Sequence, residues 1–298
     1  MKDFDPDKVI AESRAKRSRR LIEHEAARAV SRALYTDKGG QPTLRPSFVV
    51  YLDELGTSAR LERMTDEDLR ADLRAYDDLR WFLHDDTNGW DADTQRVLYF
   101  SDNLVIVSPI DATGTNRDLG LFFHIWAAAA YQLNMGIRGR MLRGGITVGD
   151  AYADNTFVTG PAHLQAVLLE EKTASNPRIL LDEACVELAR EEFNNGGYAD
   201  KSDSPYGFFL LRDADGRTFV NYLVAVSEDE GWDPNVTTVG LVGHKKQVEA
   251  ALATYTNDRV LAKYRWAAAY HNFVCETFYA RPELTITEVA PIAFERFS

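Results

Sequence analysis

Hydrophobic positions along the chain follow two spacings, one typical of buried strands and one typical of amphipathic helices. Short apolar runs rich in β-branched residues predict strands, and apolar positions three and four residues apart predict helices. The predicted strands are Phe48–Asp53, Arg96–Phe100, Leu104–Pro109, Met141–Gly149, Thr156–Val158 and Arg178–Leu181. The predicted helical segments are Asp7–Tyr35, Thr65–Phe82, Arg117–Met135, Gly160–Glu171 and His244–Tyr279.

The order of these elements predicts an α+β fold. A strand, a helix, two strands, a helix and a strand follow one another, which is the ferredoxin-like plan of an antiparallel-rich sheet with helices on one face. We predict an N-terminal helix in residues 1–40, a central domain in 46–182 and a C-terminal extension in 183–298 that packs on that domain. The extension should contain a hairpin, Phe208–Leu211 with Phe219–Val224, and helical structure after it.

The helix after the first strand carries a clear amphipathic pattern. Thr65-Asp-Glu-Asp68 is typical of a helix start, and apolar residues recur on one side of the helix behind it. The predicted buried stripe consists of Leu69, Leu73, Tyr76, Leu79 and Phe82.

Composition and charge limit the classes of function. The formal net charge of −12 argues against a general nucleic-acid binder, because a duplex needs a basic protein face. Cys185 and Cys275 form no disulfide framework or zinc motif, and residues 1–7 lack the apolar core of a signal peptide. The most apolar stretch, Leu119 to Leu133, is too short to span a bilayer. We therefore expect a cytoplasmic protein with no nucleic-acid partner and no membrane segment.

Two aspartates stand at points that this fold plan brings together. Asp53 ends the first strand and Asp102 lies in the turn between the second and third strands, so both belong to one edge of the sheet. Two carboxylates supplied by neighbouring strands suit Mg²⁺ in a nucleotide enzyme, because phosphate oxygens and water complete its coordination. The alternative is a purely local role, with Asp53 as a helix cap and Asp102 in an Asx turn.

The segments next to these aspartates suit a phosphate group. Leu55, Gly56 and Thr57 form a strand-to-helix turn in which glycine lets the backbone approach a ligand. Arg143 begins a strand with a glycine-rich backbone, where its guanidinium could bind a phosphate through two hydrogen bonds. A turn that needs glycine for geometry and a surface arginine are the alternatives. His124 and His163 lie in apolar helical contexts and are predicted to be packing residues.

Taken together, these segments resemble the class III nucleotidyl cyclase domain, and most closely the pyrimidine nucleotide cyclases of the Pycsar antiphage systems. The motifs of the domain are Tyr51-Leu-Asp53-Glu-Leu-Gly56, Phe100-Ser-Asp102-Asn103, Arg143-Gly-Gly-Ile-Thr-Val-Gly149 and Gly160-Pro-Ala162. Segments that resemble the Pycsar cyclases in particular are Glu170-Glu-Lys172, Pro177-Arg-Ile179, Lys263-Tyr-Arg-Trp266 and Tyr270-His-Asn272.

The resemblance implies a homodimer in which residues of both chains complete each active site. Asp53 and Asp102 would be the catalytic residues and would bind two divalent cations, Mg²⁺ or Mn²⁺, with the backbone carbonyl of Glu54 as a further ligand. Arg143 would match the phosphate-binding arginine of the family. The family also implies a separate effector protein that senses the cyclic product.

The sequence departs from the purine cyclases at positions that matter for specificity. Leu98 and Phe157 stand where those enzymes carry polar side chains that read the base. Leu164 and Leu168 replace an Asn and an Arg that steady the transition state. A compact pocket shaped by Tyr51, with Arg96 as a base or phosphate contact, would suit a pyrimidine.

The leading hypothesis is therefore a uridylate cyclase that converts UTP to 3′,5′-cyclic UMP and diphosphate, as second-messenger synthesis in antiphage defence. A cytidylate cyclase that uses CTP is the nearest alternative. Leu164 and Leu168 also allow a catalytically silent nucleotide-binding protein on the same fold. A metal-dependent phosphodiester hydrolase is the third alternative, although such sites gather more His and carboxylate ligands.

Overall fold

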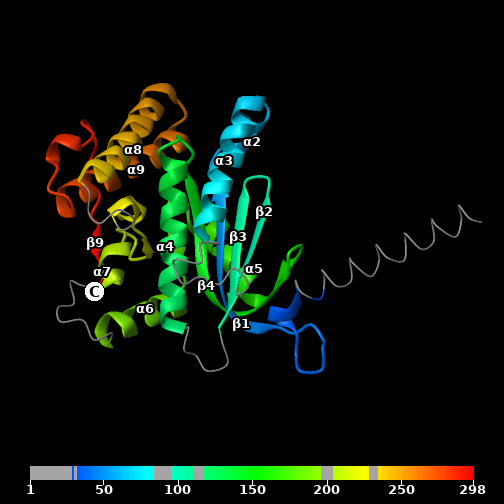
Figure 1. Cartoon of the computed structure of the whole chain (residues 1–298). Helices are drawn as coiled ribbons and strands as arrows, with labels where there is room; N and C mark the ends of the chain where they lie inside the picture. Colours follow the sequence, from blue (N-terminus) through cyan, green and yellow to red (C-terminus); the bar gives the residue numbers. More distant parts are fainter. Residues whose placement is uncertain (1–28, 30–31, 84–94, 111–116, 196–203, 228–233) are drawn as a thin grey trace, which may run out of the picture.

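In the computed structural model, a single mixed sheet runs through the molecule (Figure 1). The structure describes residues 29, 32–83, 95–110, 117–195, 204–227 and 234–298. The strands lie in the order β2-β3-β1-β4-β6-β8-β7-β9, with β5 paired to β4, and β4 with β6 is the parallel pair. Their bounds are β1 (Arg45–Glu54), β2 (Arg96–Phe100), β3 (Asn103–Pro109), β4 (Leu142–Ala153), β5 (Val158–Thr159), β6 (Ile179–Leu181), β7 (Leu210–Arg212), β8 (Thr218–Val220) and β9 (Glu295–Arg296). The α+β class and the mostly antiparallel sheet are thereby confirmed.

The helices predicted at Thr65–Phe82, Arg117–Met135 and Gly160–Glu171 are present within two residues of those bounds, whereas the helices at 183–195 and 205–209 were not predicted. Their bounds are α2 (Thr57–Leu61), α3 (Asp66–Leu83), α4 (Arg117–Gly136), α5 (Pro161–Thr173), α6 (Glu183–Asn195), α7 (Pro205–Phe209), α8 (Pro234–Thr254) and α9 (Asp258–Thr277). The segment His244–Tyr279, predicted to be helical, is helical over most of its length, but as parts of two helices, the first of which begins at Pro234. Asn257 separates two helices there, because its side chain accepts hydrogen bonds from Arg259 N and Val260 N and so caps α9. The predicted helix Asp7–Tyr35 lies almost wholly outside the described residues.

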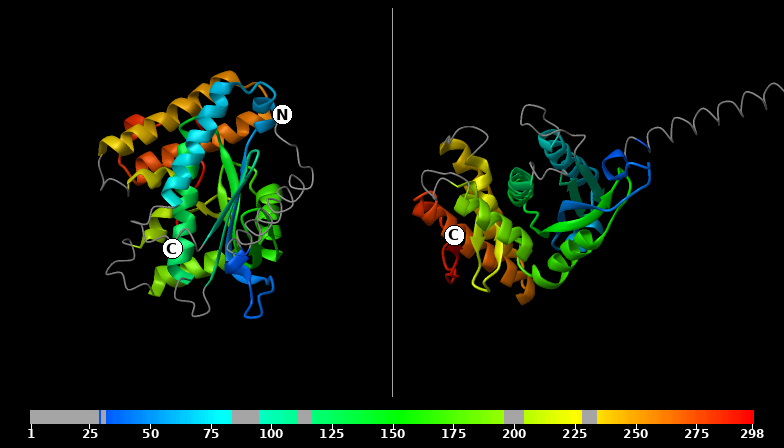
Figure 2. Two further views of the ribbon diagram at one scale, coloured as in Figure 1. Left: turned by 45° about the vertical axis from the view of Figure 1, so that its right-hand side comes forward. Right: turned by 90° about the horizontal axis from the view of Figure 1, so that it is seen from below.

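Helices cover both faces of the sheet, so the predicted cover on one face was wrong (Figure 2). On one face, α4 packs against Leu52 and Ile106. On the opposite face, α5 packs its Ala162 and Ala166 against the sheet. The reason lies in β4, where a Cβ atom at Gly145 would stand 2.7 Å from the Ala166 carbonyl oxygen. Glycine in the strand and alanine in the helix allow α5 to lie almost on the sheet backbone.

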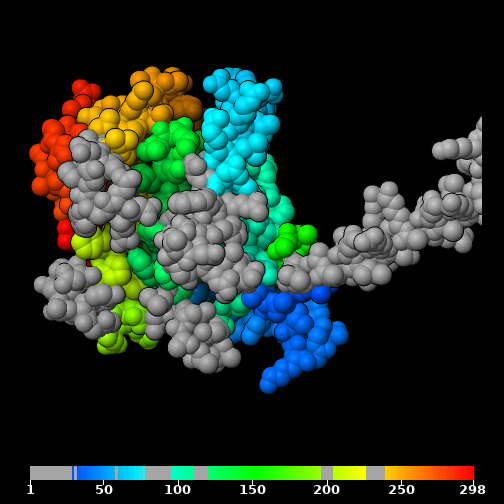
Figure 3. Space-filling view, in the orientation of Figure 1, coloured from blue at the N-terminus to red at the C-terminus, as the bar shows by residue number. Residues whose placement is uncertain are grey.

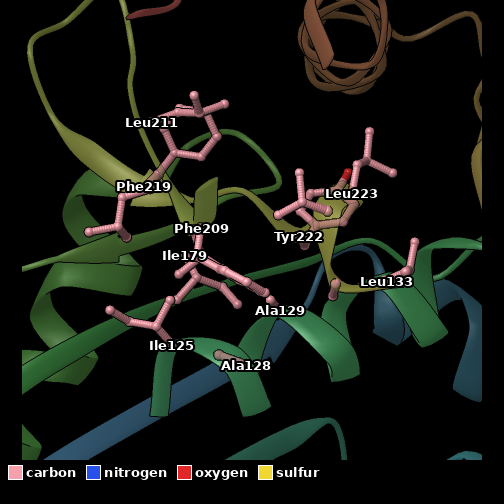
Figure 4. Packing of buried hydrophobic residues seen from close by; sticks show 14 of the residues in the cluster. Ile125, Ala128, Ala129, Leu133, Ile179, Phe209, Leu211, Phe219, Tyr222 and Leu223 are labelled. Atoms are coloured by element: carbon pink, nitrogen blue, oxygen red, sulfur yellow. The ribbon is translucent and has the colours of Figure 1, made fainter. Parts of the chain in front are cut away.

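The C-terminal part continues both the sheet and the core of the preceding part. β8 pairs with β6 through Leu180 and Phe219, and the packing residues of both parts belong to one apolar cluster (Figure 4). Arg178, which is buried, forms ion pairs with Asp213 and Asp215, and Trp266 Nε1 donates to Asp213 Oδ2 at 2.9 Å. The segment before β6, the β7–β8 turn and α9 are thus joined at one buried carboxylate.

The first half of α3 projects past the end of the sheet, where Figure 3 shows it in cyan. Leu69 and Leu73 are 47% and 52% exposed, so their predicted burial was wrong. Tyr76 is half-buried and its ring lies against Tyr99, whereas the side chains of Leu79 and Phe82 lie outside the described residues. The amphipathic pattern is real, but the side of the helix that carries Leu69 and Leu73 stays exposed in the described structure. None of the described helices combines the length and apolarity that a bilayer span requires.

Candidate functional site

The first functional position is the end of β1, where three strands meet. Asp53 lies opposite Asn103 of β3 on one side and opposite Arg143 of β4 on the other. The neighbouring Glu54 N–H donates to the Asp102 carbonyl oxygen at 3.3 Å. The β2–β3 hairpin is formed as predicted, and Ser101 adopts φ 56° in its turn. The structure therefore brings the two predicted aspartates and the predicted phosphate-binding arginine to one point.

The Arg143 guanidinium is held by two carboxylates. Its Nε and Nη2 atoms donate to Asp53 Oδ2 at 3.3 and 3.2 Å, and Nε lies 2.6 Å from Glu170 Oε1. Glu170 is buried, with 4% of its surface exposed. Sequence reasoning gave Glu170 no role in the site. The signal that could have found it is its spacing, since Ala162, Ala166 and Glu170 occupy one side of α5.

Burial and neighbouring charge alter the acidity of these carboxylates. Burial raises the pKa of Asp53, Arg143 opposes that rise, and the nearby charge of Asp102 adds to it. Burial likewise raises the pKa of Glu170 to about 7, with Arg143 opposing and Asp53 adding to the rise. The site thus holds more negative charge than its single arginine can neutralise, which favours a cationic ligand.

A second positive side chain comes from the C-terminal part. Half-buried Lys263 of α9 interacts electrostatically with Arg143, Asp53 and Glu170. Burial lowers the pKa of Lys263, and the positive charges of Arg143 and Arg259 lower it further. All of the predicted site residues lie at or before Arg143 in the sequence, so Lys263 was not among them. Lys263 belongs to a segment that resembles the Pycsar cyclases, but only the tertiary packing of α9 brings it close to Asp53 and Arg143.

Tyr51 lies on the same face of β1 as Asp53, as the period of two predicts. Its hydroxyl donates to Asn103 Oδ1 at 2.6 Å, and Asn103 Nδ2 donates to Asp102 Oδ1 at 3.4 Å. The Tyr51 and His163 rings meet edge to face at 6.1 Å, and burial raises the Tyr51 pKa to about 12. Tyr51 is therefore a neutral hydroxyl that belongs to the same hydrogen-bonded set as Asp102.

The turn after Asp53 is fixed from several sides. Leu55 N–H donates to the Met141 carbonyl at 2.8 Å, and the buried Thr57 hydroxyl donates to the Glu54 carbonyl at 2.7 Å. Gly56 has φ +80° with open space around it, a conformation in which other side chains are strained. The backbone geometry of the turn therefore favours glycine at position 56, which was the alternative explanation given for this residue.

An ion-pair network around the Glu54 side chain anchors the same turn. The Glu54 carboxylate accepts hydrogen bonds from Arg60 and Arg140, and both arginines also bind Asp72 of α3. The Glu54 side chain is 4% exposed, so removal of one partner would leave a buried charge. The network ties the side chain of Glu54, whose backbone carbonyl is the predicted metal ligand, to α2, α3 and the segment before β4.

Arg96 lies on the α5 side of the sheet but away from the aspartates. It stands opposite Val107, four residues along β3 from Asn103, or about 13 Å. Its side chain is buried, and its Nη1 donates to the Gln95 carbonyl at 2.8 Å. Leu98 lies between these points, opposite Val105, which in turn lies opposite Tyr51. A ligand that contacts both Asp53 and Arg96 would therefore extend along the sheet past Leu98.

Other positions singled out in the sequence face elsewhere. Phe157 and Leu164 are 55% and 56% exposed, and the Phe157 ring lies 6.4 Å from that of Tyr152, at the opposite end of β4 from Arg143. His124 is a packing residue, as predicted: its Nε2 pairs with the Ser108 hydroxyl at 2.8 Å and its Nδ1 with the Gly120 carbonyl at 2.6 Å. Burial lowers the His124 pKa to about 4, which keeps the ring neutral.

The arrangement offers carboxylates for cations and two positive side chains for an anion. Within the described parts of the chain, no three His, Cys, Asp or Glu side chains form a metal-binding cluster. A cation at Asp53 and Asp102 would therefore take further oxygen ligands from a phosphate or water, as Mg²⁺ commonly does. No protein-family model matches the chain, and no curated protein matches it.

Proposed function

We propose that the chain is a class III nucleotidyl cyclase of the Pycsar type that converts UTP to 3′,5′-cyclic UMP and diphosphate. The observation that supports this most is the meeting of Asp53, Asp102 and Arg143 at the end of β1. In the reaction, the ribose 3′ oxygen bonds to the α-phosphorus while the bond to the diphosphate breaks. The hydroxyl proton leaves to water. A site for this chemistry needs bound cations and a grip on the phosphates.

The residues present fit two divalent cations, Mn²⁺ or Mg²⁺. The charge of Asp102 disfavours the charged form of the partly buried Asp53, and a cation would relieve this repulsion. Asp53, Asp102 and the Glu54 carbonyl would hold the cations, whose chemistry is to stabilise the attacking and leaving oxygens of the displacement. Arg143 would bind the phosphates, with the backbone of residues 55–57 beside it.

Base selection rests on the sheet face between Tyr51 and Arg96. Leu98 supplies no hydrogen bond to a purine edge, and an unpaired buried polar atom costs about 1–3 kcal/mol. About 1.4 kcal/mol gives a tenfold preference, so one such mismatch is sufficient to disfavour ATP and GTP. Arg96 carries donors only, which favours uracil over cytosine, and CTP is the nearest competitor.

The remaining parts of the proposal come from the family resemblance. The active form would be a homodimer with shared active sites in the cytoplasm, and a separate effector would sense the cyclic nucleotide. The exposed position of Leu164 on α5 accords with a partner chain contributing to each site.

The test is product formation from an equimolar mixture of UTP, CTP, ATP and GTP with Mn²⁺, with cyclic products identified by mass. Cyclic UMP should dominate, and Asp53→Ala and Asp102→Ala should each abolish it without changing the circular dichroism of the fold. Near wild-type turnover in either variant would contradict the metal assignment. Cyclic AMP or cyclic GMP as the main product would contradict the base selection.

A catalytically silent nucleotide-binding protein is the second candidate function. It is favoured by Leu164 and Leu168, which offer no polar group to a transition state. Binding of UTP and Mn²⁺ without any cyclic product, under conditions where the bound nucleotide stays intact, would support it over the cyclase.

A further inference from the structure

Glu170 is the most deeply buried carboxylate at the candidate site, yet it has no part in the proposed function. Its Oε1 atom lies 2.6 Å from Arg143 Nε as an ion pair, and among the described residues it accepts no hydrogen bond of good geometry. A buried carboxylate with an incomplete set of partners is costly to a fold. The burial of this carboxylate is therefore expected to serve the site.

The helix that carries Glu170 gives it a fixed position. Ala162, Ala166 and Glu170 are four residues apart and face β4, and the Thr147 hydroxyl donates to the Ala162 carbonyl at 2.9 Å. Because Gly145 lets α5 lie against the strand, the Glu170 carboxylate has little freedom to move away from Arg143. A carboxylate on a packed helix is a more precise anchor than one on a loop.

We propose that Glu170 is a positioning residue for Arg143, an inference that rests on the proposed nucleotide site. In the free protein the guanidinium is divided between Asp53 and Glu170. When cations occupy Asp53, that carboxylate is no longer available to the arginine. Glu170 then keeps the guanidinium at the start of β4, where its remaining N–H groups meet the phosphates of the nucleotide.

A purely structural role for the ion pair between Glu170 and Arg143 leads to a different expected result. If Glu170 only stabilised α5, its removal would weaken nucleotide binding by the same factor whether or not Arg143 were present. If it acts through Arg143, its removal has no effect once Arg143 is absent. A double-mutant cycle separates these two cases.

The experiment measures calorimetric binding of 3′-deoxy-UTP with Mn²⁺, because this nucleotide lacks the attacking hydroxyl and cannot be cyclised. Glu170→Ala should weaken binding about tenfold, within the range of measured coupling between contacting residues. The double variant with Arg143→Ala should bind no more weakly than Arg143→Ala alone. Glu170→Gln, which keeps an acceptor oxygen, should lie in between, and Glu171→Ala on the exposed side of α5 is the matched control.

Equal weakening by Glu170→Ala in both backgrounds, or no weakening at all, would overturn the positioning role while leaving the nucleotide site intact. No binding of 3′-deoxy-UTP by the unsubstituted protein would overturn the proposed function and this inference together. Thermal unfolding shows whether each variant folds. If Glu170→Ala does not fold, Glu170→Gln takes its place in the cycle, with the same two outcomes.

Discussion

Replacing Glu170 by glutamine should change how the stability of the free protein depends on pH. Burial raises the pKa of this carboxyl to about 7, from an ordinary value of 4.5. The folded state therefore holds the proton more tightly than the unfolded state does. Between about pH 4.5 and 7 the folded state binds more protons, so the free energy of unfolding falls as the pH rises through this window.

The size of this effect follows from the two pKa values. The difference between about 7 and 4.5, at 1.36 kcal/mol per pH unit, is about 3 kcal/mol. Glutamine cannot ionise and therefore lacks this dependence. Relative to the wild type, Glu170→Gln should gain up to about 3 kcal/mol of stability between pH 5 and pH 8, because other titrating groups are common to both proteins and cancel.

Urea unfolding at pH 5 and pH 8 measures the difference directly, with Glu171→Gln as the exposed control. The control should follow the wild type at both values. Parallel changes in the free energy of unfolding of the wild type and of Glu170→Gln would refute the reasoning, since they would show that the pKa of Glu170 is not raised in the folded state. A gain in stability combined with weaker nucleotide binding would be the trade-off expected of a functional residue.

Two further predictions concern assembly and folding. Because Asp53 and Arg143 of one chain bind each other, mixed dimers of Asp53→Ala and Arg143→Ala chains should stay inactive; recovered cyclase activity would place the two residues in different chains. Arg178→Met should cost about 3–5 kcal/mol in urea unfolding, because it leaves a buried carboxylate unpaired, whereas Arg217→Met on the exposed side should cost less than 1 kcal/mol.

Local signals in the sequence were sufficient for most of the elements. Thr65 begins α3 as predicted: its hydroxyl accepts from Asp68 N–H and its N–H donates to Asp68 Oδ2. The β2–β3 hairpin follows from the turn at Ser101. Such contacts involve residues close together in the chain, so sequence patterns report them. The aspartates were found for the same reason, since each occupies a strand end.

The errors concern contacts between distant segments. The amphipathic pattern of α3 predicts that Leu69 and Leu73 lie on the same side of the helix. It does not predict whether another element covers that side. The face of the sheet that α5 covers depends on the fit between Gly145 and the helix backbone, which periodicity does not report. Glu170 and Lys263 were missed as site residues because only the packing of α5 and α9 brings them to Asp53.

The charges at the site explain why cations and nucleotide should be bound together. Three carboxylates, Asp53, Asp102 and Glu170, face two positive side chains, Arg143 and Lys263. A free triphosphate would be repelled by these carboxylates, and cations alone would displace Arg143 from Asp53 and leave it Glu170 as its carboxylate partner. In the proposed complex, the phosphates would accept hydrogen bonds from Arg143 while the cations would neutralise Asp53 and Asp102. Under the proposed function, each ligand would thus reduce the cost of binding the other, and by linkage the coupling would be equal in both directions.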